Sequence, residues 1–365
     1  MFENFLSVCK DVTKTTRKIP QGEYLSDGTY KIFDQGKNYI GGYCNTANGV
    51  ASDYPYIVFG DHTRVIKYIN EPCYIGADGV KLLKVYNNDF IPKFVYYAML
   101  ANPVEHQGYS RHFKLLKETK IRKYDKSIQN TIIDELDKIN LAISLKESIL
   151  NHLDELVKSR FIEMFGNPDA NEKEWEKSKL ENFINVVGGY AFKSQKYLSE
   201  GIPVLRIGNI NAGYFKDTNL VFYQEDSALE KYKIYPNDLV ISLTGTAGKD
   251  DYGNICLIDS TYDVYYLNQR NAKIEIKHTF NRFFLMHLFS HPEIKQRLTG
   301  KNHGIRQGNI LNKDILELDV YVPPIELQNE FADFVKLIDK SKFIVQKQID
   351  DLQELLDSKM DEYFG

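Results

Sequence analysis

The sequence contains few cysteines and no long apolar run. Its four cysteines are scattered, and no two of them form a Cys-x-x-Cys pair. This spacing fits neither a disulfide framework nor a zinc site, so we expect reduced, structural cysteines. No stretch approaches the roughly 18 uninterrupted apolar residues that span a bilayer. The four cysteines are Cys9, Cys44, Cys73 and Cys256.

Features of an export signal are also missing. The N-terminal stretch MFENFLSVCKD carries an acidic residue, Glu3, and no basic region ahead of an apolar segment. We therefore expect a cytoplasmic protein without a membrane partner. The 365 residues, 43% hydrophobic and 26% charged, are enough for two folded domains of ordinary size.

A strong excess of charge of one sign is absent as well. The net charge is -4, but the acidic residues concentrate near the C-terminus. Residues 1–125 carry 17 basic and 13 acidic residues, whereas 324–365 carry 5 basic and 10 acidic residues. Both globular segments can present local basic faces, although neither is basic enough to demonstrate a polyanionic partner.

What the sequence does contain is a repeat with an offset of about 199 residues. The stretch LDELVKSRFIEMFG ends at Gly166, and LQELLDSKMDEYFG ends at Gly365. A period this long predicts two tandem domains, each closed by one long helix, and excludes a short-period solenoid.

The two repeated segments have the apolar spacing of long amphipathic helices. Each shows a heptad-like seam with steps of three and four, and Lys146 occupies one position of the first seam. A helix of such length could pack alone on its own domain, but a small domain cannot cover it, so an antiparallel coiled coil is favoured. The seams are Ile132, Leu136, Ile139, Ile143, Leu150, Leu153 and Val157, and Phe331, Val335, Ile338, Val345, Ile349, Leu352 and Leu356.

Turn-forming residues set the domain boundaries. Gly166-Asn167-Pro168 predicts the end of the first helix, and Pro323-Pro324 the start of the second. Short β-branched and aromatic runs before the first helix and between the two helices predict β-rich domains with one shorter helix each, at 92–100 and 280–289. The strand-like runs include 80–85, 202–207, 238–244 and 271–276. The predicted segments are a first domain (1–125), a central helix (126–166), a second domain (167–323) and a C-terminal helix (324–365).

Motifs for catalysis and cofactor binding are missing. TGTAGKD (244–250) is not a phosphate-binding loop, because Leu243 stands where glycine is required and Asp250 replaces the Ser or Thr. His287 and His291 have helical ligand spacing but no evident third ligand. VPPI resembles the methyltransferase motif only in its prolines, since Val322 replaces the polar residue. We expect a non-catalytic chain without metal or cofactor.

Clusters of Arg, Lys, Asn and Gln mixed with glycines and aromatics remain. They lie at 36–43, 59–65 and 76–81 in the first domain, and at 188–197, 267–274 and 302–310 in the second. Such side chains can contact base edges, and glycines permit close backbone approach. Any single residue could equally serve ordinary turn chemistry, but the clusters together favour a functional surface.

These residues carry a family resemblance. GGYAFKSQKYLSEGIPVLRIGNINAG, DLVISLTGTAGK, LNQRNAKI and IRQGNI with YVPPIELQNEF resemble a target recognition domain of the specificity subunits of type I restriction-modification enzymes. IFDQGKNYIGGY, YPYIVFGDHTRVIKY and GADGVKLLKV look like another variety of the same domain. The resemblance covers the whole chain, although the shorter first domain matches the common pattern less well.

The resemblance implies an α+β fold with two target recognition domains, joined by two long helices in an antiparallel coiled coil with pseudo-twofold symmetry. It implies a subunit without catalysis that reads a bipartite double-stranded DNA target. Its partners would be two modification (methyltransferase) subunits and restriction (motor-nuclease) subunits, and S-adenosylmethionine, ATP and Mg would belong to those partners. A regulatory or decoy scaffold that binds methyltransferase subunits without reading DNA is the alternative.

The candidate DNA-binding residues fall into three groups. Lysines would contact phosphates, a second group would read bases, and the rest lie beside them in the polar clusters. The first group is Lys37, Lys193 and Lys249, and the second is His62, Arg64, Asn268, Gln269, Arg306 and Gln307. The remaining candidates are Asn38, Thr63, Lys81, Tyr190, Ser194, Thr244, Thr246, Arg270 and His303.

Overall fold

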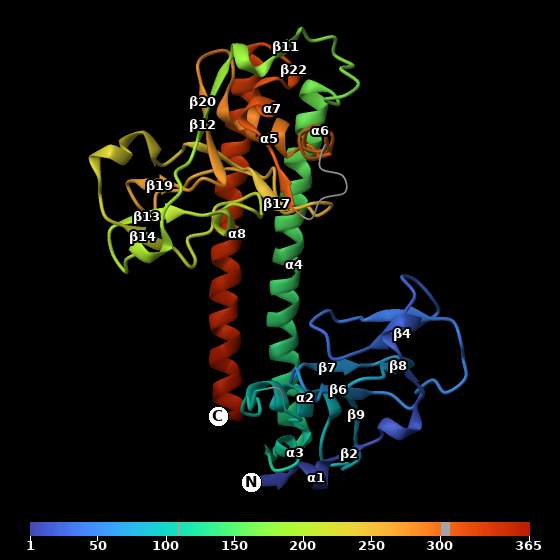
Figure 1. Cartoon of the computed structure of the whole chain (residues 1–365). Helices are drawn as coiled ribbons and strands as arrows, with labels where there is room; N and C mark the ends of the chain where they lie inside the picture. Colours follow the sequence, from blue (N-terminus) through green and yellow to red (C-terminus); the bar gives the residue numbers. More distant parts are fainter. Residues whose placement is uncertain (109, 301–306) are drawn as a thin grey trace. The chain divides into compact units, whose positions relative to one another are not determined.

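The computed structural model describes residues 1–108, 110–300 and 307–365, and it divides into two compact units (Figure 1). Unit 1 comprises Met1–Ile149 and Val345–Gly365, and unit 2 comprises Leu150–Ile344. Each unit therefore contains one globular domain and part of both long helices, α4 (Lys126–Phe165) and α8 (Ile325–Phe364). Among the described residues, no helix is both long and apolar enough to cross a membrane.

Domain 1, the globular part of unit 1, contains two four-stranded sheets. The first has the order β2-β9-β6-β7 and is antiparallel; the second has the order β3-β8-β4-β5, with β8 parallel to β3 and β4. The elements are β1 (Phe2–Asn4), α1 (Phe5–Val8), β2 (Cys9–Asp11), η1 (Thr13–Thr15), β3 (Lys18–Ile19), η2 (Gln21–Glu23), β4 (Tyr30–Phe33), β5 (Gly42–Cys44), β6 (Tyr56–Gly60), β7 (Ile66–Ile69), β8 (Cys73–Gly76), β9 (Val80–Val85), α2 (Pro92–Ala101), α3 (Phe113–Leu116) and β10 (Lys120–Arg122).

The antiparallel sheet of domain 1 is buried on both faces. Alternate residues of a strand point to opposite faces, and β6 is apolar on each. Ile57 and Phe59 belong to the core shared with α2 and the long helices, whereas Tyr56 and Val58 belong to the core that includes Ile75 of β8. This explains why β6 is a continuous apolar run instead of an alternating one.

Domain 2, the globular part of unit 2, also has two four-stranded sheets, with orders β12-β20-β16-β18 and β14-β13-β19-β15. A short two-stranded ribbon, β17-β21, is added. The elements are β11 (Lys177–Lys179), η3 (Leu180–Asn182), β12 (Ile184–Gly188), η4 (Ser194–Lys196), β13 (Ile202–Leu205), η5 (Ile207–Asn209), β14 (Val221–Tyr223), η6 (Ser227–Tyr232), β15 (Lys233–Ile234), β16 (Leu239–Ser242), β17 (Thr244–Thr246), β18 (Ile255–Leu257), β19 (Tyr265–Leu267), β20 (Asn271–Ile276), α5 (Arg282–Ser290), α6 (Pro292–Thr299), β21 (Gln307–Asn309), α7 (Asn312–Leu316) and β22 (Asp319–Tyr321).

The long helices pair in antiparallel fashion in both units. In unit 1, Glu135 of α4 pairs with Lys359 of α8. Further along α4, Lys146 pairs with Gln348, which lies earlier in α8, so the two helices run in opposite directions. In unit 2, ion pairs join Asp154 to Lys342 and Arg160 to Glu330 in the same sense. The predicted coiled-coil architecture is confirmed.

The predicted seams form the helix contacts, and they are most deeply buried where a domain covers them. Leu136 and Phe331 are 0% exposed, whereas Ile143 and Val345 are only half-buried. At the end of α4, Gly166 has a φ of 80° and its N–H donates to the Ile162 carbonyl at 2.8 Å. This left-handed residue terminates the helix where the sequence predicts it.

The two domains share most of their topology, but one edge strand of the mixed sheet differs, since β3 is parallel to β8 whereas β15 is antiparallel to β19. Both antiparallel sheets have equivalent strand orders, and in both mixed sheets a central parallel pair, β8 with β4 or β19 with β13, carries an antiparallel neighbour. The motif Tyr-Leu-Ser-acid-Gly occurs at 24–28 and again at 197–201. Its leucines form equivalent antiparallel bridges, Leu25 with Tyr43 and Leu198 with Phe222. The domains are thus repeats in structure as well as in sequence.

All four cysteines are buried and free of disulfides, as the sequence predicts. Burial raises the pKa of the Cys9, Cys73 and Cys256 thiols to about 12. These thiols therefore stay protonated at neutral pH and act as small apolar core residues.

Candidate nucleic-acid interface

Polar segments of domain 2 that are far apart in the sequence converge on the loop after β19. The Gln269 N–H donates to the Tyr190 carbonyl at 2.9 Å, which ties this loop to the 188–197 segment. The Leu243 N–H donates to the Arg270 carbonyl at 2.8 Å, which ties it to the start of β17. Backbone bonds thus assemble the predicted clusters into one region.

The loop itself has a fixed backbone and projecting side chains. Asn271 is fully buried, and its Nδ2 donates to the Leu205 carbonyl at 2.9 Å. The Asn268 Oδ1 accepts from the Arg270 N–H at 3.3 Å, while the side chains of Gln269 and Arg270 are exposed. A rigid loop with exposed amide and guanidinium groups is suited to contacts with a base edge.

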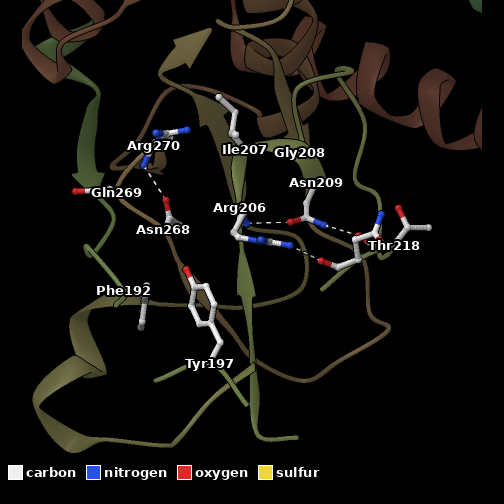
Figure 2. A pocket seen from close by; sticks show the side chains of 11 residues that line it. Phe192, Tyr197, Arg206, Ile207, Gly208, Asn209, Thr218, Asn268, Gln269 and Arg270 are labelled. Carbon is white, nitrogen blue, oxygen red and sulfur yellow. Dashed lines mark hydrogen bonds between the residues drawn. The ribbon is translucent and has the colours of Figure 1, made fainter. Parts of the chain in front are cut away.

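A pocket of about 500 Å³ opens beside this loop (Figure 2). The ring of Tyr197 forms part of its wall, and Arg206 and Arg270 both line it. The described residues that line the pocket include no carboxylate. Its electrostatic character therefore favours an anionic ligand.

Arg206 was not predicted as a site residue. The sequence pattern assigned it to the strand-like run 202–207, but β13 ends at Leu205 and Arg206 begins the following loop. Its Nη2 donates to the Asn219 carbonyl at 2.6 Å, and its buried Nε has no hydrogen-bond partner among the described residues. The turn-forming Gly208-Asn209 pair was the available signal that the strand ends early.

The remaining candidates of the 188–197 segment differ in their surroundings. Tyr190 is half-buried, and its ring packs 5.0 Å from that of Phe192 and 5.1 Å from that of Tyr232. Lys193 and Ser194 are exposed at the start of η4. The ring of Tyr190 therefore packs within the domain, whereas the side chain of Lys193 is open to solvent.

The ribbon β17-β21 carries further candidates. Thr246 pairs with Gln307 across the ribbon, and both are exposed; Thr244 is half-buried. Lys249 is exposed in the following turn, where its N–H donates to the Thr246 carbonyl at 3.0 Å. The candidates His303 and Arg306 lie outside the described residues.

In domain 1, an internal lysine supports the loop after β4. Lys67 is 3% exposed, and its Nζ donates to the Asn38 carbonyl at 2.6 Å and lies 3.4 Å from Asp34. Burial lowers the pKa of Lys67, against the opposing effect of the Asp34 carboxylate. The loop presents Lys37 and Asn38 as exposed side chains.

A glutamine joins this loop to the turn after β6. The Thr63 hydroxyl donates to the Gln35 carbonyl at 2.7 Å, and the His62 N–H donates to Gln35 Oε1 at 3.3 Å. Two predicted clusters of domain 1, at 36–43 and 59–65, are therefore neighbours in space.

Two candidates of domain 1 already have partners within the domain. The Arg64 Nη1 donates to the Val104 carbonyl at 3.0 Å, and the backbone of Arg64 has a positive φ of 63°. Lys81 lies 3.2 Å from Asp11 and 4.8 Å from the centre of the Phe113 ring. Direct base contacts by either residue would require these interactions to rearrange, so Lys37 and Asn38 are better placed.

Within the described part of the chain, no group of three or more His, Cys, Asp and Glu side chains is arranged to hold a metal ion. His287 is held within its own helix, because its Nδ1 donates to the Phe283 carbonyl at 2.9 Å. His291 lies just beyond the end of α5.

A comparison with protein families gives one match. The model of the type I restriction modification DNA specificity domain matches residues 172–354, which is half of the chain. The chain belongs to this family. The match includes domain 2, with the Gln269–Arg270 loop and the ribbon, and most of α8.

Two curated relatives of the specificity-domain family are similar to this chain. The EcoBI specificity subunit of Escherichia coli is 24% identical over 162 residues, covering 44% of this chain and 31% of that protein. The MjaVIII specificity subunit of Methanocaldococcus jannaschii is 26% identical over 188 residues, covering 50% of this chain and 43% of that protein. The matched regions span less than half the length of both relatives.

Solved structures of this family share the fold. The specificity subunit from M. genitalium superposes with a TM-score of 0.58 at 16% identity, over 100% of this chain and 96% of that one. A chain from a structure of type I restriction-modification complex assembly gives a TM-score of 0.56 at 14% identity, over 100% and 97%. These likenesses confirm the predicted fold class.

Proposed function

We propose that this chain is the DNA-sequence-specificity subunit of a type I restriction-modification system. Each domain would read one half of a split double-stranded DNA target. The observation that carries the proposal is the assembly of three polar segments of domain 2 around the Gln269–Arg270 loop, beside a pocket without acidic groups. The names of the related specificity subunits support it.

The candidate residues would divide the work of recognition. Exposed lysines such as Lys37, Lys193 and Lys249 would contact phosphates and orient the protein, because phosphate contacts carry no sequence information. Exposed amides and guanidinium groups, as in Gln269, Arg270 and Gln307, would read base edges.

Catalysis would belong to other subunits of the complex. The chain would hold two modification subunits and, for cleavage, restriction subunits. S-adenosylmethionine, ATP and Mg would bind to those partners and not to this chain. The complex would work in the cytoplasm, where the DNA is.

The alternative function is a scaffold that binds methyltransferase subunits without reading DNA, and the salt dependence of DNA binding separates it from the proposed function. We expect the complex of the full chain with its methyltransferase subunits to bind duplex DNA more weakly as salt rises, with a steep dependence, because counterions are released from contacted phosphates. The measurement is the slope of log K against log salt concentration for a duplex that carries the target.

Matched variants make this test specific. The double variant Lys193→Ala and Lys249→Ala should reduce the slope by roughly two, at about one per lost phosphate contact. Lys177→Ala, which removes an exposed lysine from β11, is the control and should leave the slope unchanged. A flat salt dependence of the parent complex would favour the scaffold.

A further inference from the structure

The ribbon β17-β21 rests on a single buried tyrosine. Gly245 and Gly308 are directly paired across the ribbon, and both lie against Tyr252, which is 1% exposed. A Cβ at Gly245 would lie 2.7 Å from the Cβ of Tyr252, and one at Gly308 would lie 2.9 Å from its Cε2 and closer still to its hydroxyl end. The tyrosine side chain therefore crosses beneath both strands, and only glycine fits above it.

The pleat of the ribbon turns its other side chains away from Tyr252. Directly paired residues share a face, and neighbouring pairs alternate between faces. Because the glycine pair faces Tyr252, the pairs Thr244–Asn309 and Thr246–Gln307 face the opposite side. Thr246, Gln307 and Asn309 are exposed and Thr244 is half-buried, so the outward face is polar.

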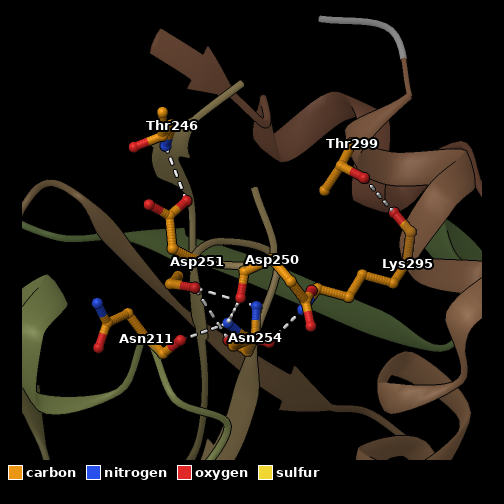
Figure 3. A network of polar contacts seen from close by, with 8 residues as sticks. Asn211, Thr246, Asp250, Asp251, Asn254, Lys295 and Thr299 are labelled. Atoms are coloured by element: carbon orange, nitrogen blue, oxygen red, sulfur yellow. Dashed lines mark hydrogen bonds and ion pairs between the residues drawn. The ribbon is translucent and has the colours of Figure 1, made fainter. Parts of the chain in front are cut away.

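Further bonds hold the turn after β17 in place (Figure 3). The Thr246 N–H donates to the Asp251 carboxylate at 2.8 Å. From α6, the Lys295 ammonium contacts both Asp250 and Asn254.

The tyrosine itself is tied to the same helix. The Tyr252 hydroxyl donates to the carbonyl of Thr299, in the last turn of α6, at 3.2 Å. A two-stranded ribbon of this length is only marginally stable alone, so these contacts are what keep it rigid.

We propose that β17-β21 is a base-reading ribbon for the half-site of domain 2, with Tyr252 as its positioning residue. This inference rests on the DNA-recognition function proposed above and adds Asn309 and Tyr252 to the candidate residues. The major groove admits a two-stranded ribbon, and Gln and Asn side chains pair with the N6 and N7 atoms of adenine. The ribbon therefore selects adenine in this half-site.

Domain 1 has a different arrangement at the equivalent place. After β6, residues 61–63 form a turn, and within 1–108 and 110–125 no strand pairs with this segment. Changes in the ribbon should therefore affect one half-site only.

The experiment selects duplexes from a random-sequence pool with the full chain bound to its methyltransferase subunits. The variants Gln307→Ala and Asn309→Ala remove outward side chains, and Tyr252→Ala removes the support. Ser260→Ala changes an exposed residue outside the ribbon and is the control. Circular dichroism and thermal melting establish that each variant is folded.

The expected result is that Gln307→Ala, Asn309→Ala and Tyr252→Ala lose at least about fivefold discrimination for adenine in one half-site. The other half-site should keep the parental preference in every variant, and the Ser260→Ala control should keep the parental preference in both half-sites. Gln307→Ala and Asn309→Ala require no rearrangement of the core. If both variants keep the parental base preferences, this inference is overturned while the proposed function stands. Equal weakening on all sequences would do the same, because it indicates phosphate contacts. A parent complex that selects no sequence would overturn the proposed function as well.

Discussion

Single residues in domain 2 have two kinds of environment, and we expect substitutions in the two environments to affect DNA binding differently. Gln269 and Arg270 are exposed side chains on a loop fixed by buried bonds, including the one from Asn271 to Leu205. Lys193 is an exposed charge beside a short helix, without a comparable constraint. Rigid placement favours directional contacts with bases, whereas a flexible ammonium favours phosphates.

We predict that Gln269→Ala combined with Arg270→Ala relaxes base discrimination at one half-site. A well-formed bidentate base contact contributes about 1–3 kcal/mol of discrimination, so the preference should fall by at least about fivefold. The measurement is competition binding of the complex with duplexes that carry single base changes in either half-site. Lys193→Ala is the matched control, which should weaken all duplexes alike. The same uniform weakening in the double variant would make Gln269 and Arg270 phosphate contacts.

At the scale of elements, helix α5 packs a histidine against the long helices. The ring of His287 lies 5.1 Å from that of Phe331 on α8 and 6.4 Å from that of Phe161 on α4. Burial lowers the pKa of His287, with a smaller contribution from the Lys342 charge and an opposing one from the bond to Phe283. The folded protein therefore favours the neutral form of this histidine more than the unfolded chain does.

This histidine predicts a pH dependence of stability. Below its unfolded pKa of about 6.5, the unfolded chain binds a proton that the folded chain excludes, so the free energy of unfolding falls with falling pH. Above that pH the contribution is fully present. The free energy of unfolding, measured with urea at pH 7.5 and at pH 5.5, should differ less between the two pH values for His287→Leu than for the parent. His278→Leu, at an exposed histidine, should keep the parental difference; an equal difference in all three proteins would contradict the prediction.

The sequence predicts the strands that a local run of residues defines. It does not predict strands that form only by pairing with a segment far away in the chain. Strand β9 (Val80–Val85) and strand β20 (Asn271–Ile276) have the predicted bounds, because their β-branched and aliphatic runs are bounded by turn residues. The run 238–244 was predicted as one strand, but it divides into β16 and the start of β17. The second of these pairs with β21, which is remote in the sequence, so no local pattern indicates the ribbon.

The candidate site shows the same limit. The polar clusters could be predicted, because Arg, Lys, Asn and Gln recur together with glycines and aromatics in several segments of each domain. Tyr252 could not, because a tyrosine beneath two glycines becomes visible only when Gly245 and Gly308 are paired. Arg206 was hidden in an apolar run that reads as a strand.

At the scale of the whole molecule, the repeat is more extensive than the helices indicate. The offset of the long helices was visible directly, whereas the domains differ in length and diverge in sequence. The Tyr-Leu-Ser-acid-Gly motif at 24–28 and 197–201 was an available signal that was missed. Its equivalent bridges show that the motif has the same place in the β-strand framework of both domains.

Helix α4 is continuous from unit 1 into unit 2, and this continuity predicts a role for the long helices in setting the spacer of the DNA target. Lys146 of α4 contacts Gln348 of α8 at 2.7 Å, so insertions beside both residues keep the two helices in step. One heptad in each helix adds about 10 Å at 1.5 Å per residue and preserves the direction of the seam. We predict that the double insertion lengthens the unread spacer by about three base pairs, at 3.4 Å each, and leaves both half-sites unchanged.

Mapping methylated sites in cells that carry the parent or the insertion variant measures this directly. An insertion of four residues in each helix is the comparison, because it rotates the seam by about 40° and should weaken helix pairing while adding only about 6 Å. The half-site sequences serve as an internal control, since each domain keeps its own loops. If the half-site sequences change and the spacer keeps its length, the helices do not set the spacer. The inserted residues would then not have moved the recognition domains along the duplex.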